Sequence, residues 1–287
     1  MIAPGGALAS RMIDVHYHAG PDITRRRHSV VQAGRHYRAA SGWVVVKSHL
    51  DSTAAAAWEA RQEGFPVSGS VVLNALAGGV DHRVVQRAVF AHGGDSPARL
   101  VVYLPTLTPH PHASALPAEP FHPRFHREHW SQARVTDDSG HLRPEVRDVL
   151  RCARDLDVVV ATGHCQRDEV LAIVDAAADI GLDRLLLTHA THPLSGFSET
   201  DIGLLSTAGH VWVEVTALTV LMGHRSLDHL ARLVASHPRV VLSSDLGQLT
   251  QPDVPEAWAM IDRWCADLGV DREAMTVSIP HQLLAGS

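Results

Sequence analysis

DVVVATGH (residues 157–164) and RLLLTH (184–189) each contain a short, nearly continuous apolar run and end on a histidine. Runs of this length, rich in valine and leucine and without polar alternation, are typical of strands buried on both faces of a parallel sheet. Six similar runs occur along the chain: IDVHYH (13–18), WVVVKSH (43–49), VSGSVVLN (67–74), RLVVYLPT (99–106), HVWVEVTA (210–217) and RVVLSSD (239–245). We therefore expect eight parallel strands.

Helix signals fill the intervals between these runs. The predicted helices include 30–41, 54–63, 82–92, 144–156 and 199–207. Each begins beside a residue that favours a helix start: Ser29, Thr53, Asp81, Pro144 and Ser198. Strands that alternate with helices predict an α/β fold, and eight such units close naturally into a (β/α)8 TIM barrel, here one domain over residues 1–287.

The competing architecture is a doubly wound open sheet. Its usual signature is a glycine-rich turn after the first strand, but here that turn reads HAGPD (18–22). The length of 287 residues, of which 45% are hydrophobic, suits a barrel, which typically needs about 250 residues. The barrel is therefore the preferred interpretation.

Composition limits the partners. A formal net charge of -6 argues against nucleic acid, and no apolar run approaches the roughly 20 residues of a membrane span. The three cysteines lack CxxC spacing, which favours a reducing compartment, and the first residues lack the features of a signal peptide. We expect a cytoplasmic protein with a small-molecule substrate, without nucleic-acid or membrane partners, and with a homo-oligomer as an open alternative.

The interval between the fourth and fifth runs is nearly twice as long as the others. The surplus, residues 105–141, is rich in proline and contains His110, His112, His122, His126, His129 and His141. In a barrel it leaves the carboxyl end of the fourth strand, where active sites are built, so it is predicted to be a lid or mouth insertion. A solvated insertion and a subunit contact are the alternatives. DDSG (137–140) within it predicts a hairpin turn.

Polar side chains at the strand ends carry the chemistry. His16 and His18 are two residues apart, so they share one face of the first strand and point into the barrel if Val15 and Tyr17 point outward. Three more candidate ligands end the fifth, sixth and eighth runs: His164, His189 and Asp245. Imidazole nitrogen and carboxylate oxygen are ligands that zinc prefers, so we expect these five side chains to meet around a metal ion.

This pattern resembles the amidohydrolase superfamily of metal-dependent hydrolases, and specifically a poorly characterised branch of it. The resemblance covers the whole predicted barrel and includes HAGPD (18–22), KSH (47–49), TGH (162–164), LTHATHP (187–193) and IPHQLLAG (279–286). It implies that His16, His18 and His164 ligate metal. It also implies that His189 ligates metal or contacts substrate, and that Asp245 is both ligand and general base.

The resemblance does not supply the substrate, but the expected metal favours a reaction: a metal-activated water cleaves an amide, cyclic amide or lactone bond of a small molecule. The expected cofactor is a divalent metal, first Zn2+, with Mn2+ or Fe2+ as alternatives, as one or two ions. A nonoxidative metal-dependent decarboxylase and a catalytically inactive metal-binding barrel are the alternatives. A phosphoesterase ranks lower because the strand ends supply too few carboxylates.

The chain departs from the superfamily at one position. Two-metal members commonly bridge their ions with a carboxylated lysine or a glutamate from the fourth strand, but RLVVYLPT (99–106) offers neither. Lys47, on the second strand, is the candidate for that place. A lysine desolvated there has a depressed pKa, so it could form a carbamate, act as a neutral amine or hold a substrate anion. The alternative is a lysine whose amine reaches water at the barrel rim.

Four further side chains complete the predicted site. His49 shares the face of Lys47, and His192 follows His189 by three residues, where it contacts substrate or caps the next turn. Arg25, in the first loop, is a candidate to grip a substrate carboxylate. Glu214 lies within an apolar run, where an unpaired charge is too costly, so it is predicted to pair with Lys47 or with a histidine N–H.

Overall fold

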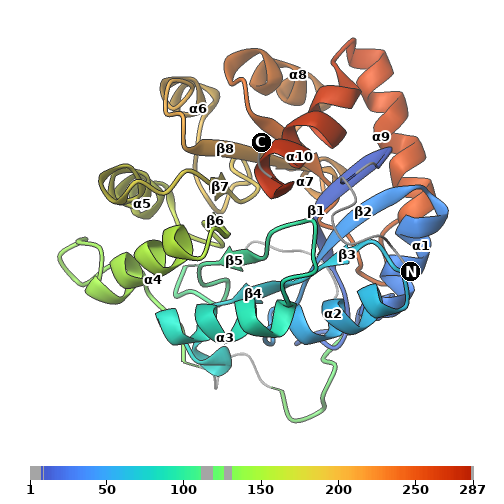
Figure 1. The fold of residues 1–287 in the computed structure, drawn as a ribbon. Coiled ribbons are helices and arrows are strands. Elements are labelled where there is room, and N and C mark those ends of the chain that lie inside the picture. Colours follow the sequence, from blue (N-terminus) through green and yellow to red (C-terminus); the bar gives the residue numbers. More distant parts are fainter. Residues whose placement is uncertain (1–7, 9, 111–118, 126–130, 286–287) are drawn as a thin grey trace.

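The computed structural model describes residues 8, 10–110, 119–125 and 131–285 (Figure 1). Each of the eight apolar runs forms strand structure. The strands are β1 (Met12–His18), β2 (Gly42–Lys47), β3 (Val67–Ser68), β4 (Ser70–Val72), β5 (Val101–Tyr103), β6 (Val159–Ala161), β7 (Leu185–Leu187), β8 (Val211–Thr216) and β9 (Val240–Ser243). Every pair of neighbouring strands is parallel, which confirms the α/β class with a parallel arrangement.

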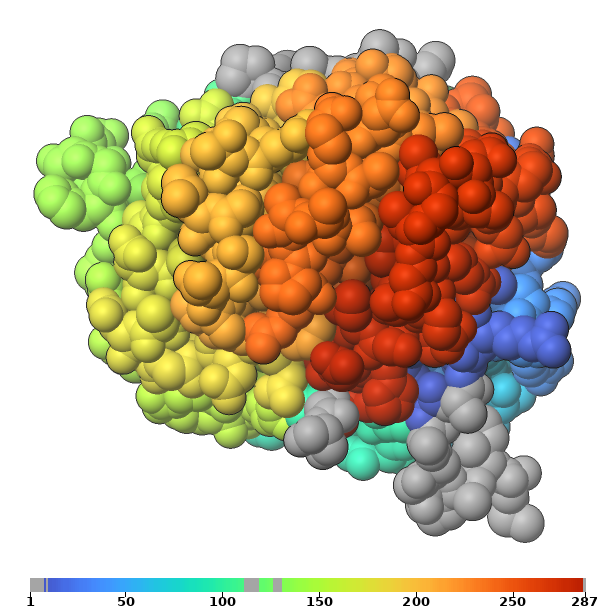
Figure 2. All heavy atoms as spheres, turned by 90° about the horizontal axis from the view of Figure 1, so that it is seen from above, coloured from blue at the N-terminus to red at the C-terminus, as the bar shows by residue number. Residues whose placement is uncertain are grey.

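The helices lie around the outside of the strands (Figure 1), and in Figure 2 the colours of the second half follow one another across the surface in chain order. They are α1 (Val30–Ala39), α2 (Ala54–Gln62), the short η1 (Ala75–Ala77), α3 (His82–His92), α4 (Pro144–Asp155), α5 (Arg167–Ile180), α6 (Glu199–Leu204), α7 (Ala217–Leu221), α8 (Leu227–Ser236), α9 (Val254–Leu268), the π-helix η3 (Ala274–Ser278) and α10 (Ile279–Ala285). The five predicted helices start where expected. Ser29, Asp81 and Ser198 cap their helices, whereas the Thr53 hydroxyl donates to Val46 O instead.

The strands form two hydrogen-bonded sheets rather than the expected single closed eight-stranded barrel. One contains β1, β2 and β3, and the other runs from β4 to β9. The third predicted strand is divided at Gly69, because the Gly69 amide donates to the His92 imidazole at 3.0 Å. The two sheets thus adjoin at two seams, one at Gly69 between β3 and β4 and one between β1 and β9. At the second seam, residues beyond β9 pair with β1: Asp245 N donates to His16 O at 2.8 Å and His18 N donates to Leu246 O at 2.7 Å.

Two hydrophobic clusters hold this arrangement. The larger one fills the space between strands and helices, and it includes Tyr17 and Tyr37. The smaller one lies inside the ring of strands, where it includes Val15, Val45 and Tyr103. Leu283 and Leu284 of α10 belong to this inner cluster, and Arg99 N, just before β5, donates to Leu284 O. The final helix therefore covers the amino ends of the strands and leaves their carboxyl ends for the site.

The segment 105–141 is described in part, and His112, His126 and His129 lie outside the described residues. Residues 119–121 pair with the first loop, since Arg25 N donates to Glu119 O at 2.9 Å and Phe121 N donates to Ile23 O at 3.1 Å. The hairpin predicted at 137–140 is confirmed: Asp137 N donates to His141 O at 2.9 Å. His110 bonds to Glu169, whereas His122 and His141 are exposed. The role of a lid stays a prediction.

Within the described ranges, no helix combines the length and the apolar composition that crossing a lipid bilayer requires.

The seam at Gly69 makes the fold sensitive to acid. Burial, reinforced by the Arg61 guanidinium, lowers the pKa of His92 from 6.5 to about 3. The unfolded chain therefore binds a proton between those values that the folded chain does not, so the free energy of unfolding falls as the pH drops from about 6.5 toward 3.

We expect His92→Gln to flatten this dependence by about 1.4 kcal/mol per pH unit between pH 4 and 6, measured by urea unfolding. His82→Gln, which replaces a partly exposed histidine of the same helix, is the control and should keep the wild-type slope. Equal slopes for the wild type and His92→Gln would contradict a neutral, buried imidazole at this seam.

Candidate metal centre

A β-bulge in β1 brings His16 and His18 to the inside. Asp14 pairs with Val44 and Tyr17 with Val46, so two residues, Val15 and His16, stand opposite Val45 alone. Val15 lies in the inner cluster, so the expectation that it points outward was wrong, whereas Tyr17 does lie in the outer cluster. Because a bulge inserts one residue, both members of the bulged pair can face the inside.

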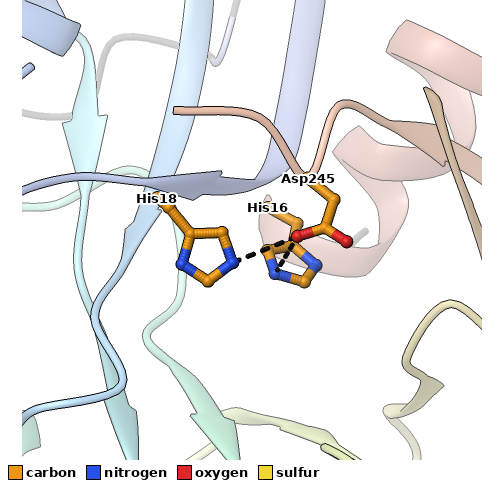
Figure 3. A group of neighbouring side chains, drawn as sticks. All are labelled: His16, His18 and Asp245. Atoms are coloured by element: carbon orange, nitrogen blue, oxygen red, sulfur yellow. Dashed lines mark hydrogen bonds and ion pairs between the residues drawn. The ribbon is translucent and has the colours of Figure 1, made fainter. Parts of the chain in front are cut away.

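Asp245 meets both histidines just beyond β9 (Figure 3). Its Oδ1 lies 3.2 Å from His16 Nε2 and 3.1 Å from His18 Nε2. The three side chains are almost fully buried, and each offers one ligand atom within 4.8 Å of the others. Residues far apart in sequence thus form a compact set of two imidazoles and one carboxylate.

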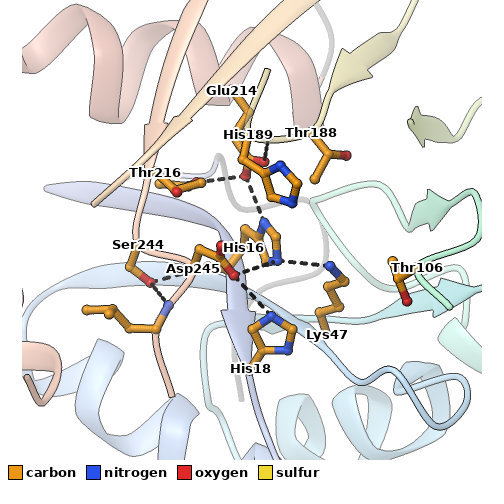
Figure 4. A network of polar contacts seen from close by, with 12 residues as sticks. His16, His18, Lys47, Thr106, Thr188, His189, Glu214, Thr216, Ser244 and Asp245 are labelled. Atoms are coloured by element: carbon orange, nitrogen blue, oxygen red, sulfur yellow. Dashed lines mark hydrogen bonds and ion pairs between the residues drawn. The ribbon is translucent and has the colours of Figure 1, made fainter. Parts of the chain in front are cut away.

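Glu214 on β8 orients His16 (Figure 4). Its Oε1 is 3.0 Å from His16 Nδ1 and accepts from the Ser243 hydroxyl, and its Oε2 accepts from the His189 amide at 2.7 Å. Although burial opposes ionisation, His16 and these hydrogen bonds hold the pKa of Glu214 below its usual value. The predicted pairing with a histidine N–H is confirmed. Because a carboxylate only accepts, His16 Nδ1 is the donor in its contact with Glu214.

Two site residues have a left-handed backbone. His189 has φ of 30° and Asp245 has φ of 54°, conformations that residues other than glycine, asparagine and aspartate seldom adopt. The surrounding hydrogen bonds fix both: Glu214 holds the His189 amide, and His16 O accepts from the Asp245 amide. Such strained positions persist where the structure over-determines them, which is common at functional sites.

His164 reaches the site through a tight turn after β6. Gly163 has φ of +62°, and its amide donates to Thr188 Oγ1 at 3.0 Å. A Cβ added to Gly163 would lie 2.2 Å from Leu104 O. The His164 ring lies 5.2 Å from that of His189 and 5.8 Å from that of His49, measured between centroids.

These side chains border a cavity of about 550 Å³ at the carboxyl ends of the strands. Its polar wall includes His18, His164, His189 and Asp245. Apolar side chains from the loops face them: Ile23, Leu107, Leu218, Met222 and Leu249. The cavity is large enough for a small organic molecule with both polar and apolar parts.

Lys47 lies below the cavity, fully buried at the end of β2. Its Nζ is 3.1 Å from His16 Nε2 and 4.4 Å from the centroid of the Tyr103 ring. Burial lowers the pKa of Lys47 to about 8, against the opposing effect of Asp245 and Glu214. The alternative in which the amine reaches water at the rim is therefore excluded.

The other predicted substrate contacts all lie at the cavity. The His49 ring stacks on that of His18 at 4.7 Å, and its Nδ1 bonds to Thr106 Oγ1. His192 also accepts from Leu194 N, so it both lines the cavity and caps the next turn. Arg25 pairs with Glu119 at the exposed rim, 2.9 Å away.

Two buried aspartates lie closer to the site than the sequence indicated, since Asp14 was expected only at the base of the first strand and Asp22 only as a substrate contact in the first loop. Asp22 binds Arg26 at 2.6 Å and accepts from the His49 amide at 2.7 Å; with His18 and His49 it forms a second possible ligand group. Asp14 accepts from His16 N and from Ser244 N, which neighbours Asp245. It therefore ties together the two backbone segments that carry ligands. Only its position within an apolar run could have signalled this role.

The electrostatics suit a cation. Burial lowers the pKa of His18 to about 4 and that of His189 to about 3, so both rings are neutral near pH 7, as metal ligands must be. Burial opposes ionisation of Asp245, but the neighbouring histidines hold its pKa well below the usual range. His189 Nδ1 is buried and makes no hydrogen bond with any residue that the structure describes. An orphaned imidazole nitrogen beside a carboxylate and two imidazoles fits a divalent metal ion.

Comparison with known proteins places the chain in context. The family model described as "Family of unknown function (DUF6282)" matches residues 11–214. No protein of curated function matches the sequence.

Two crystal structures of an amidohydrolase from Burkholderia multivorans are similar in fold. The form with bound zinc has a TM-score of 0.53 and the form with bound HEPES one of 0.52. Both are 13% identical to this chain, and each comparison covers 96% of this chain and 99% of the other.

Gly163→Ala should destabilise the protein by well over 2 kcal/mol, because the new Cβ meets Leu104 O and the backbone is left-handed. Gly181→Ala is the matched control: Gly181 has φ of +75° but nothing within 4 Å of its Cβ position, so it should lose only about 1–2 kcal/mol. Denaturant unfolding measures both losses. Equal losses would show that close packing at the β6 turn does not matter.

Glu214→Gln should weaken zinc binding by about 10–100-fold, because the amide cannot both accept from His16 and accept from the His189 backbone as the carboxylate does. Competition with a chelator measures the affinity of the metal-free protein for Zn2+. Glu199→Gln, on the surface helix α6, should leave it unchanged. Unaltered affinity in Glu214→Gln would mean that this carboxylate does not support a metal centre.

Proposed function

The chain belongs to the DUF6282 family, whose function is unknown, and we propose from its site that it is a metal-dependent hydrolase with a small-molecule substrate. One observation carries this proposal. One oxygen of the buried Asp245 carboxylate lies 3.2 Å from His16 Nε2 and 3.1 Å from His18 Nε2. Two imidazole nitrogens gathered around one carboxylate oxygen form a ligand set that a divalent cation of the zinc class accepts.

His16, His18 and Asp245 are the proposed primary ligands. His164 and His189, on the neighbouring strand ends, are proposed to complete the set. A bound divalent ion of the zinc class supplies Lewis acidity, which polarises a substrate carbonyl and makes water nucleophilic at neutral pH. The similarity in fold to a zinc-bound amidohydrolase supports this assignment as an analogy.

Asp245 is the proposed general base. Its carboxylate stays ionised because the surrounding histidines hold its pKa well below the usual range despite burial. It is placed at the cavity wall, where it can accept a proton from the attacking water and deliver it to the departing nitrogen or oxygen. Amides, cyclic amides and lactones are the substrate bonds that this proton transfer serves.

Lys47 is proposed to act through His16 rather than on substrate directly, since the described residues bordering the cavity do not include it. Its amine lies 3.1 Å from His16 Nε2. We propose that it adds to carbon dioxide, which forms an N–C bond and releases one proton, and that the resulting carbamate would help to hold metal in a two-ion centre. His49, His192 and Arg25 are proposed to contact substrate.

For the complete architecture, we propose a closed (β/α)8 barrel with residues 105–141 at its mouth.

Asp245→Asn tests the proposal. Asparagine keeps the size of the side chain and tolerates the left-handed backbone, so folding and fluorescence spectra should be preserved. Turnover of the best substrate in a panel of amides, cyclic amides and lactones should fall at least about 10³-fold. Asp228→Asn, in the first turn of α8, is the control and should keep full activity.

Three outcomes would redirect the assignment. Full activity in Asp245→Asn would remove Asp245 as the base. Release of carbon dioxide without incorporation of oxygen from labelled water would identify the nonoxidative decarboxylase instead. A metal-loaded wild type that turns over nothing in either assay would favour the inactive metal-binding barrel.

A further inference from the structure

A second group of metal-binding side chains lies away from the cavity. It comprises His28 just before α1, His36 within α1, and Asp253, the N-cap of α9. Each offers one ligand atom, and these atoms lie within 4.8 Å of one another. The two imidazole rings are 4.3 Å apart between centroids, and His28 Nε2 is 2.8 Å from Asp253 Oδ1. None of the three is among the described residues that line the cavity.

The spacing of these atoms matches a tetrahedral ion. Zinc binds imidazole nitrogen and carboxylate oxygen at about 2.0–2.2 Å, which places neighbouring ligand atoms about 3.3 Å apart. The closest pair here is separated by 2.8 Å, and no pair by more than 4.8 Å. Small side-chain rotations about this geometry are therefore enough to enclose an ion.

Some of the possible ligand atoms make no hydrogen bond with the residues that the structure describes. Asp253 Oδ1 accepts from Val254 N and pairs with His28, while Asp253 Oδ2 makes no hydrogen bond among the residues described. With the same restriction, the His36 ring contacts His28 but makes no hydrogen bond. The His28 side chain is 11% exposed and that of Asp253 is 33% exposed, so an ion can enter from solvent.

We propose that His28, His36 and Asp253 bind a divalent cation of the zinc class, at a site separate from the proposed catalytic centre. Two imidazoles and one carboxylate are a ligand set that zinc accepts, and a water molecule completes four-coordination. The ion joins the first loop and α1 to the start of α9, which is distant from them in sequence.

The position of the site indicates a structural role. The loop before His28 is fastened to the segment before Asp253, since Arg27 N donates to Gly247 O and the Arg27 guanidinium donates to Leu249 O and Gln251 O. The same two segments supply one wall of the cavity, including Arg26 and Gln248. An ion at the base of this wall cross-links it to α1 and keeps the cavity open at a fixed width.

Zinc stoichiometry tests the proposal without any assay of activity. Metal-free protein is equilibrated with micromolar free Zn2+, and bound metal is counted by mass spectrometry. His36→Ala should lose one equivalent relative to the wild type, and Asp253→Asn, which keeps the helix cap, should bind that equivalent more weakly. His82→Ala, which replaces a partly exposed histidine on α3, should match the wild type.

A second background separates this site from the catalytic one. His18→Ala should retain the equivalent that His36→Ala loses, and adding a chelator should lower the melting temperature of His18→Ala but not of the double variant His18→Ala/His36→Ala.

If His18→Ala binds no zinc, the second site is refuted and the proposed function stands. If His18→Ala binds as much as the wild type, the catalytic metal is refuted instead. Equal zinc stoichiometry in the wild type and His36→Ala would overturn the second site. So would a wild type that binds the second equivalent of zinc only at millimolar concentrations.

Discussion

The site depends on one buried carboxylate. Glu214 sits in the middle of β8 with no access to solvent, where an uncompensated charge would be very costly. Its two oxygens are satisfied by groups from three other segments: the His16 ring, the Ser243 hydroxyl and the His189 amide. The same contacts that make its burial tolerable orient the His16 ring and fix the strained backbone of His189. Stability and site geometry are therefore set by one network.

The rest of the architecture brings strand ends into reach of that network. The inner cluster and α10 fill the floor, so polar groups collect at the opposite end of the strands. Each seam between the two sheets is closed by a specific polar contact rather than by a continuous ladder. His92 takes the Gly69 amide at one seam, and Asp14 joins β1 to residue 244 at the other. The second of these seams is also the one that unites His16 with Asp245.

The sequence predicted the elements well because apolar runs and cap residues are local signals. Eight runs became strand structure. His18, His164, His189 and Asp245 line one cavity, and His16 contacts Asp245 beside it. Features that depend on pairing were not predictable. The bulge at Val15 and His16 breaks strict alternation, and the interruption at Gly69 requires a histidine 23 residues away. In the first loop, Arg26 is the buried partner of Asp22 and Arg25 pairs with Glu119 at the exposed rim, a difference between neighbouring arginines that the sequence does not show.

The placement of the ligands has a consequence for biogenesis. His16 is synthesised long before Asp245, and Leu283 and Leu284 of α10 follow later still. Much of the outer layer can assemble while translation continues, but the proposed ligand set is incomplete until Asp245 has emerged, and the floor beneath it is incomplete until α10 has. A metal ion bound by this set would therefore be acquired only after the strands between His16 and Asp245 have been made.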